Sequence, residues 1–391
     1  MSNSAGILVA TTALVLAGCT DAPRRGRSLP PDWEQPGLAE AQKQEEQRIL
    51  EPPQAAAQVQ SSGTNLYGAG AQPGQGSRGR SPSRTGEWVP LQRWSRDSGV
   101  AQLGALAAAP QTAYALRSPR GVFSLTTSAQ LAHWDGLDLY LGFAPQSING
   151  QPYVNRLDLD KSIRPLLETG ARLATSIRPV VVIDPGHGGS DSGTRSILGA
   201  RWEKEFTLDW ALRLRAALTQ TGWQAVLTRS SDTDMAISNR VTLAEQLRAG
   251  LFISLHFNSA GVNHAESGLE TYCLTPAGMA SSITRGYSDE PGQAFPNNAY
   301  DEQNLQLAAC VHRALLEVNG HHDRGVRRAR FPGVLRGQQR PAILVEGGYL
   351  SCPREAGLIA EPHYRQQLAE AVARAVNACA NGKLESEAQT K

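Results

Sequence analysis

Short apolar runs alternate with longer segments of helical periodicity along the carboxy-terminal half of the chain. Residues 179–183 form a β-branched run, as in a strand buried on both faces of a parallel sheet. Residues 203–221 repeat apolar side chains at i, i+3 and i+4 spacing, which indicates a helix. Further strands are expected at residues 223–228, 251–255, 269–273 and 342–345, and helices at 236–249, 301–319 and 363–380. The alternation predicts an α/β fold with a mainly parallel sheet flanked by helices.

Four polar side chains are expected at one edge of this sheet. His187 follows the first strand, and His256 and Glu346 end two later strands. Glu203 begins the helix that comes after the first loop. Because ligands of open α/β sheets bind at the carboxyl ends of the strands, these side chains are predicted to lie close together.

Each of these four residues also has a structural interpretation when it is taken alone. A histidine beside a glycine turn, a histidine at a strand end and an acid at a helix start are all common features. Glu346 is the hardest to explain in this way, because an acid directly after an apolar strand needs a partner. Two imidazoles and a carboxylate from separate elements form the ligand set of a catalytic zinc site, and a second carboxylate can move protons. The combination therefore favours a metal site.

The first 19 residues have the features of an export signal. Residues 5–16 are apolar but too short to span a bilayer, and residues 16–19 read Leu-Ala-Gly-Cys. This tetrapeptide resembles a bacterial lipobox, in which the cysteine becomes the lipidated first residue of the mature protein. We therefore expect a lipoprotein-type signal peptide over residues 1–19 and a lipid anchor to a membrane at Cys19. A plain secretory signal is the alternative, because no Lys or Arg precedes the apolar run.

Residues 20–87 are rich in Pro, Gln, Gly, Ser and Arg, and residues 72–84 contain no apolar residue to bury. Such a segment cannot offset its ordering entropy, which predicts a disordered tether. A flexible coil of this length has an r.m.s. span of roughly 45 Å. Residues 383–391 are predicted to form a disordered tail.

Residues 88–170 have the composition of a folded segment and are predicted to form a small α+β domain. Residues 114–117 and 122–125 flank a Ser-Pro-Arg-Gly turn, which indicates a hairpin, and Asn149-Gly150 is a second turn signal. The segment resembles the copper amine oxidase N-terminal-like domain, which implies an accessory or wall-binding unit. His133 alone does not make a copper site, because metal sites cluster their ligands.

The carboxy-terminal segment, residues 178–382, resembles the zinc-dependent N-acetylmuramoyl-L-alanine amidases, the amidase 3 family. The matching motifs occur in family order: VVIDPGHGG at 181–189, EK at 203–204, LTR at 227–229, Arg240, FISLHFN at 252–258, GLETY at 268–272, DRGV at 323–326, VLR at 334–336 and LVEGGYLS at 344–351. The resemblance implies that His187, Glu203 and His256 bind Zn²⁺ and that Glu346 is the catalytic acid/base. It also implies hydrolysis of the amide between N-acetylmuramic acid and L-alanine of the peptidoglycan stem peptide. Glu205, two positions further on, is the alternative to Glu203.

The implied substrate also suggests which residues bind it. Arginine captures carboxylates through paired hydrogen bonds, and the stem peptide bears carboxylates. We therefore expect Arg324 and Arg336, together with Asn258, to contact the substrate, with a solvated basic face as the alternative for each arginine. Residues 276–299 are rich in Gly, Pro, Ser and Asn, which favours an open substrate loop with Glu290 as a solvated acid. The alternative for Glu290 is that it reaches the metal.

Composition narrows the remaining classes of function. Lys plus Arg number 38 and Asp plus Glu 36, a net charge of +2, so we expect no nucleic-acid partner. The alternatives to the amidase are a zinc peptidase acting within the stem peptide and a non-catalytic, lipid-tethered wall-binding protein. The expected location is the cell envelope, lipid-anchored and either periplasmic or at the outer membrane facing the wall. No sequence feature identifies a regulatory protein partner.

Four cysteines lie outside the signal segment, at Cys273, Cys310, Cys352 and Cys379. An even number permits disulfides in an oxidising compartment, through three full pairings. A buried free thiol is the alternative for Cys379, because it lies on the apolar face of its predicted helix.

Overall fold

The computed structural model describes residues 86–107, 112–168 and 179–381. The predicted signal peptide (1–19) with Cys19, the predicted tail (383–391) and nearly all of the predicted tether (20–87) lie outside the described residues. Within the described residues, no helix combines the length and hydropathy needed to cross a membrane.

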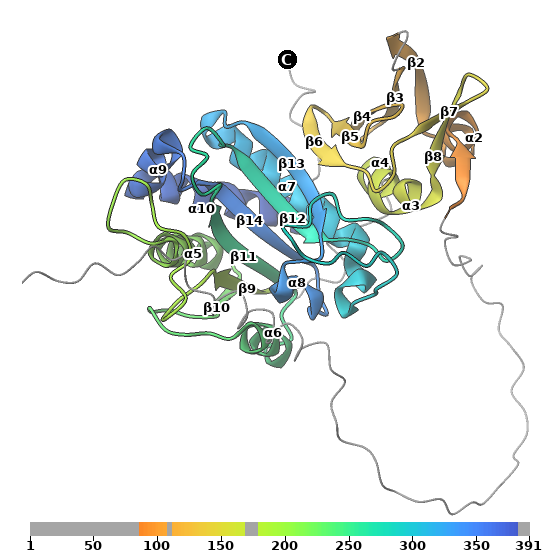
Figure 1. Cartoon of the computed structure of the whole chain (residues 1–391). Helices are drawn as coiled ribbons and strands as arrows, with labels where there is room; N and C mark the ends of the chain where they lie inside the picture. Colours follow the sequence, from red (N-terminus) through yellow and green to blue (C-terminus); the bar gives the residue numbers. More distant parts are fainter. Residues whose placement is uncertain (1–85, 108–111, 169–178, 382–391) are drawn as a thin grey trace, which may run out of the picture. The chain divides into compact units, whose positions relative to one another are not determined.

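The carboxy-terminal segment is built on a mainly parallel sheet (Figure 1). Its strands, in spatial order, are β10 (Gln224–Leu227), β9 (Val180–Pro185), β11 (Leu251–Asn258), β14 (Ala342–Tyr349), β12 (Leu269–Leu274) and β13 (Asp323–Ala329). All neighbouring pairs in this series are parallel except β14 with β12. The predicted α/β fold is therefore confirmed.

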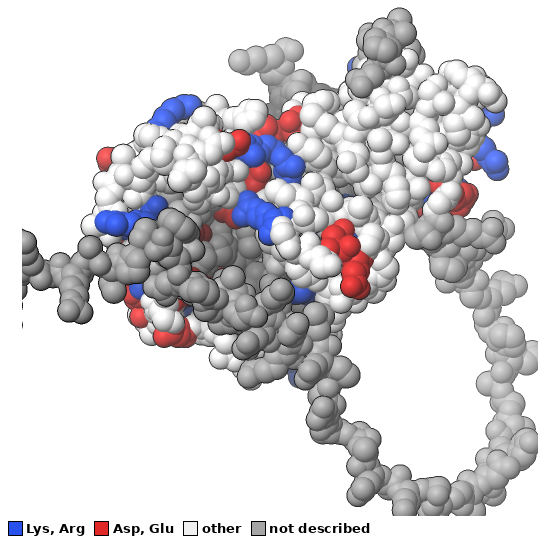
Figure 2. All heavy atoms as spheres, viewed as in Figure 1, with Lys and Arg blue, Asp and Glu red and all other residues white. Residues whose placement is uncertain are grey.

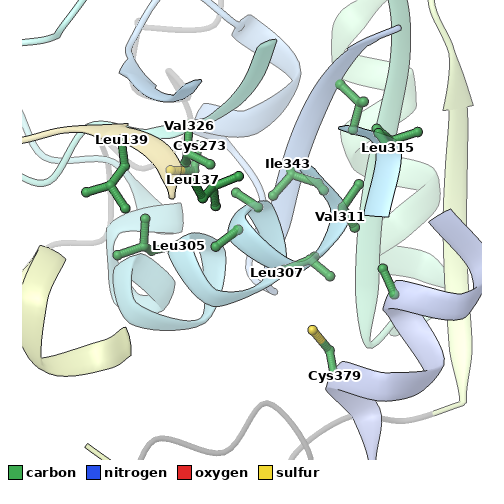
Figure 3. Packing of buried hydrophobic residues seen from close by; sticks show 14 of the residues in the cluster. Leu137, Leu139, Cys273, Leu305, Leu307, Val311, Leu315, Val326, Ile343 and Cys379 are labelled. Atoms are coloured by element: carbon green, nitrogen blue, oxygen red, sulfur yellow. The ribbon is translucent and has the colours of Figure 1, made fainter. Parts of the chain in front are cut away.

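Helices cover both faces of this sheet. They are α5 (Glu203–Gln220), α6 (Ile237–Gln246), α7 (Asp301–Asn319), α8 (Gly333–Arg336), α9 (Pro353–Ala360) and α10 (Pro362–Ala380). Val181 and Ile183 of β9 belong to the larger hydrophobic core with residues of α5, α7 and α10, whereas Val182 belongs to a second core with residues of α6 and α8. Successive side chains of a strand point to opposite faces, so a β-branched run of this kind buries both of them. Figure 3 shows Val311 of α7 and Ile343 of β14 in the larger core.

Residues 86–168 form antiparallel strands and short helices. In chain order these are β1 (Trp88–Pro90), α2 (Leu91–Ser98), β2 (Ala101–Ala107), β3 (Ala113–Ser118), β4 (Gly121–Thr126), β5 (Leu131–Trp134), β6 (Leu137–Tyr140), β7 (Gln146–Ile148), β8 (Gln151–Asn155), α3 (Arg156–Asp158), a π-helical turn (Leu159–Ile163) and α4 (Arg164–Leu167). The predicted hairpin is β3–β4, and the predicted Asn149-Gly150 turn joins β7 to β8 with φ values of 52° and 76°. Positive φ at both positions is the type I′ geometry that Asn-Gly favours.

Residues 86–168 and the carboxy-terminal segment share one sheet. Strand β6 runs parallel to β13, with Leu139 opposite Val326, and the described residues thereby form a sheet of eleven strands. The sequence predicts separate domains at 88–170 and 178–382, but this strand pair joins their sheets. Another contact is between α4 and α7, where Gln306 Nε2 donates a hydrogen bond to Pro165 O at 2.7 Å. Pairing with β6 covers an edge of β13 that would otherwise be open to other chains.

Two smaller expectations concern single residues of these segments. His133 of β5 hydrogen-bonds Asp138 of β6 (Nδ1 to Oδ1, 2.7 Å), so this ring has a structural partner. The resemblance of residues 88–170 to the copper amine oxidase N-terminal-like domain stays a prediction. All four described cysteines are free thiols. Cys379 is buried, which matches the buried free thiol given above as the alternative to a disulfide.

Candidate active site

The carboxyl ends of three parallel strands bring the predicted site residues together. His187 lies two residues beyond β9, His256 lies near the end of β11, and Glu346 lies opposite His256 in the register of β11 with β14. Glu203 is the first residue of α5. One ligand atom from each of His187, Glu203 and His256 lies within 4.8 Å of the others. The structure thus gathers the three residues that the resemblance implies as metal ligands.

The loop after β9 is held by hydrogen bonds from Arg240, and one of its positions requires glycine. Arg240 Nη1 donates to Asp184 Oδ1 at 2.7 Å, and Arg240 Nη2 donates to the carbonyl of His187 at 2.9 Å. His187 itself has a left-handed φ of 63°. A Cβ at Gly186 would lie 2.3–2.6 Å from the ring of His256, so only glycine fits beside this histidine.

Hydrogen bonds orient the side chains of the cluster. His187 Nδ1 donates to Asp191 Oδ1 at 2.8 Å, which turns Nε2 toward Glu203 Oε1, 3.1 Å away. His256 Nδ1 lies 3.1 Å from the same carboxylate oxygen. A carboxylate on the second nitrogen of an imidazole is the arrangement that fixes metal-binding histidines. Asp191 was not among the sequence predictions, because its role depends on a loop whose path the sequence pattern does not reveal.

The carboxylate of Glu203 is held in its ionised state. It is almost fully buried and accepts hydrogen bonds from Thr194 N and Phe257 N, each at 3.0 Å. Burial raises the pKa of Glu203, but the two histidines outweigh it and lower that pKa below the usual range. Burial lowers the pKa of His187, and Glu203 with Asp191 raises it to about 10. A cluster that retains a proton this strongly is also suited to a divalent cation, which would replace the proton.

Glu346 has different surroundings. Its carboxylate is buried, Oε2 has no hydrogen-bond partner among the described residues, and Oε1 lies 3.8 Å from Nη1 of Arg285. Burial raises the pKa of Glu346 to about 8; Arg285 opposes that rise, and Glu203 adds to it. A carboxyl that titrates near neutral pH can both accept and donate a proton, which is the property of a general acid/base.

The remaining candidate residues make contacts within the protein. Asn258 Nδ2 donates to Glu270 Oε2 at 2.8 Å, and Arg324 Nε donates to Glu270 Oε1 at 2.9 Å. Arg336 is only 2% exposed, and its guanidinium lies over the ring of Tyr287, so substrate contact would require the covering loop to move. Substrate contact by Asn258, Arg324 and Arg336 stays a prediction. The sequence does not distinguish a solvated arginine from one that faces a buried carboxylate, and Glu270 is such a carboxylate.

The two alternative acids lie outside the cluster. Glu205 Oε1 accepts a hydrogen bond from Trp202 N and Oε2 accepts one from Arg201, so this side chain caps the start of α5. Glu290 is exposed on its loop, as expected of a solvated acid.

A histidine–carboxylate cluster beside a buried carboxyl, at the strand ends of an α/β sheet, is an arrangement that suits a metal-dependent hydrolase. The sequence profile described as Amidase_3, N-acetylmuramoyl-L-alanine amidase, matches residues 181–378, half of the chain. The chain belongs to this family. Membership confirms the predicted class of enzyme and peptidoglycan as its substrate.

Individual relatives match the same part of the chain. The N-acetylmuramoyl-L-alanine amidase AmiA of Escherichia coli K12 is 30% identical over 218 residues, which cover 50% of this chain and 74% of AmiA. The amidase LytC of Bacillus subtilis 168 is 32% identical over 192 residues, 49% of this chain and 34% of LytC. The solved catalytic domain of CwlV from Bacillus (Paenibacillus) polymyxa var. colistinus is 33% identical, covers 51% of this chain and 96% of that domain, and has a TM-score of 0.42.

Proposed function

We propose that this amidase cleaves the bond between N-acetylmuramic acid and L-alanine with a water molecule activated at a zinc ion. His187, Glu203 and His256 would hold the ion, and Glu346 would serve as the acid/base. The observation that carries this proposal is the approach of three ligand atoms to within 4.8 Å of one another beside a buried carboxyl. Two imidazoles, one carboxylate and an open fourth position are the donor set of catalytic zinc.

The donor groups fit such an ion in their chemistry. Asp191 accepts a hydrogen bond from Nδ1 of His187, so Nε2 is the nitrogen that faces Glu203 and is free to coordinate once its proton is lost. The ionised state of Glu203 supplies the negative charge that offsets part of a divalent charge. A bound zinc ion supplies Lewis-acid polarisation of the amide carbonyl and lowers the pKa of water to about 7.

Glu346 then handles the protons of the reaction. Its carboxylate accepts a proton from the attacking water, whose oxygen bonds to the lactyl carbonyl carbon. When the carbon–nitrogen bond breaks, Glu346 returns that proton to the amine of L-alanine. The products are a free lactyl carboxyl on the sugar and a free peptide amine, and the carboxylate is regenerated. Burial suits Glu346 to this task, because it keeps the pKa of the carboxyl near neutral.

Analysis of digested peptidoglycan by mass spectrometry tests the proposed bond specificity. New lactyl carboxyl ends on muramic acid support the amidase reaction. Cuts between amino acids would indicate a stem-peptide peptidase instead, and an undigested wall would indicate a binding protein.

We also propose that the chain acts in the cell envelope, anchored to a membrane by a lipid on Cys19. The apolar run at 5–16 and the Leu-Ala-Gly-Cys sequence that ends at Cys19 support this placement, as does an envelope polymer as substrate.

A further inference from the structure

The loop between β12 and the 3₁₀ turn Pro296–Tyr300 carries an arginine into the active site. Arg285 has a left-handed φ of 46°, Gly286 follows with 81°, and Tyr287 N donates to Thr284 O at 2.9 Å, which defines a tight turn. The loop is tied down by Asp289, which accepts a hydrogen bond from Arg330 Nη1 at 2.6 Å. These hydrogen bonds therefore fix the backbone position from which the side chain of Arg285 extends.

One end of the Arg285 guanidinium is anchored on the sheet. Its Nη2 donates to Asn258 Oδ1 at 2.9 Å, to Tyr272 OH at 2.8 Å and to Glu270 Oε2 at 3.2 Å. The guanidinium carbon also lies 5.4 Å from the ring centre of Tyr272 and 5.3 Å from that of Phe331. Hydrogen bonds and aromatic faces together restrict a side chain that would otherwise sample many rotamers.

The other end of the guanidinium faces Glu346. Arg285 Nη1 lies 3.8 Å from Glu346 Oε1, and within the described part of the chain it is the cationic group in ion-pair contact with this carboxylate. The neighbouring Glu270 has two further arginines, with Arg324 Nε at 2.9 Å and Arg327 Nε at 3.6 Å. Loss of Arg285 would therefore leave Glu270 paired but Glu346 without a cation.

We propose that Arg285 is a positioning residue of the amidase reaction. Its Nη1 keeps a positive charge 3.8 Å from Oε1 of Glu346, and this charge orients the carboxyl that exchanges protons with water and amine. A fixed charge aimed at a reacting group contributes to the rate without reorganisation during the reaction. The inference rests on the proposed acid/base role of Glu346 and adds to it a residue from the loop that follows β12.

Enzyme kinetics on a soluble muramyl-peptide test the inference with the variants Arg285→Ala and Arg285→Lys. The control is Arg374→Ala, at an exposed position of α10. Arg285→Ala should lower kcat by about 10- to 100-fold, with little change in KM, bound zinc or melting temperature. Arg285→Lys should recover part of kcat, and free guanidinium ion added to Arg285→Ala should recover part as well. Arg374→Ala should match the wild type.

Two outcomes would overturn the inference. One is an unchanged kcat in Arg285→Ala, which together with a raised KM would make Arg285 a binding group only. The other is a rise in kcat, which would mean that Arg285 obstructs the reaction. Glu346→Gln separates this inference from the proposed function. If Glu346→Gln is inactive while Arg285→Ala is fully active, only the role of Arg285 fails, whereas an active Glu346→Gln removes the basis of both.

Discussion

Two carboxylates of the site differ in charge state because their immediate neighbours differ. Glu203 accepts two backbone hydrogen bonds and faces two imidazoles, which favours its ionised form. Glu346 has an unpartnered oxygen and one cation at 3.8 Å, so burial dominates and raises its pKa to about 8. The first suits a metal ligand and the second suits a group that moves protons.

Metal analysis of Glu203→Gln and Glu205→Gln tests which acid at the start of α5 binds the ion. A neutral amide is a poor zinc ligand, so Glu203→Gln should bind zinc more weakly by more than about 10-fold. Glu205→Gln should retain the metal, because this side chain caps the helix start. Metal loss in Glu205→Gln with retention in Glu203→Gln would reverse the assignment.

Replacing Glu346 by Gln should separate proton transfer from metal binding. The amide keeps the shape of the side chain but removes the base, so kcat should fall by at least about 100-fold. Zinc content should stay unchanged, because His187, Glu203 and His256 remain. Glu290→Gln, an exposed acid of the nearby loop, is the matched control and should keep full activity. Loss of zinc from Glu346→Gln would mean that Glu346 is itself a ligand.

The sequence predicts the four central residues because strand ends and a helix start place them. It does not predict Asp191 or Arg285, since each reaches the site from a loop, and loop paths depend on contacts such as Arg330 with Asp289. The sequence also does not predict the burial of Arg336 against Tyr287, because this contact depends on the path of the loop that carries Tyr287.

At the scale of elements, the largest departure from expectation is the pairing of β6 with β13. Only Leu139 and Val326 are in register, and a contact of this length leaves no periodic signal in the sequence. Helix α6 shows a smaller difference, because it ends at Gln246 and not at residue 249. Arg248 takes the left-handed φ of 49° that usually marks glycine, so the helix ends before Gly250.

Asp158 at the end of α3 should make stability depend on pH. Its buried carboxylate accepts hydrogen bonds from Gly142 N and Phe143 N, but burial dominates and raises its pKa from 3.8 to about 6. A raised folded-state pKa stabilises the fold below pH 4, and this contribution is lost as the pH rises through 6. The change is on the order of 3 kcal/mol.

Denaturant unfolding between pH 4 and pH 7 measures this contribution. In Asp158→Asn the corresponding fall in unfolding free energy should be absent, whereas the control Asp97→Asn, at an exposed position of α2, should retain it. Identical pH profiles for Asp158→Asn and the wild type would show that another group is responsible.

At the scale of the whole molecule, the amidase segment follows a long amino-terminal stretch that carries the predicted export signal and tether. On the face shown in Figure 2, basic and acidic side chains are interspersed. The membrane attachment that we propose uses a lipid at Cys19.

Fractionation of cells that express Cys19→Ala tests the anchor. The variant should leave the membrane fraction and appear in the soluble envelope fraction with its amidase activity intact. Cys310→Ala is the matched control and should stay with the membranes. Persistent sedimentation of Cys19→Ala with membranes would point to a different attachment.

The central claim is that the chain is a zinc-dependent amidase, and one measurement tests it most directly. Purified peptidoglycan is digested with the enzyme as isolated, after removal of metal by a chelator, and after zinc is added back, and the products are identified by mass spectrometry. The account predicts new lactyl carboxyl ends on muramic acid with the first sample, none with the second and their return with the third. Cleavage between amino acids, or undiminished amidase products from enzyme shown to be free of metal, would contradict it.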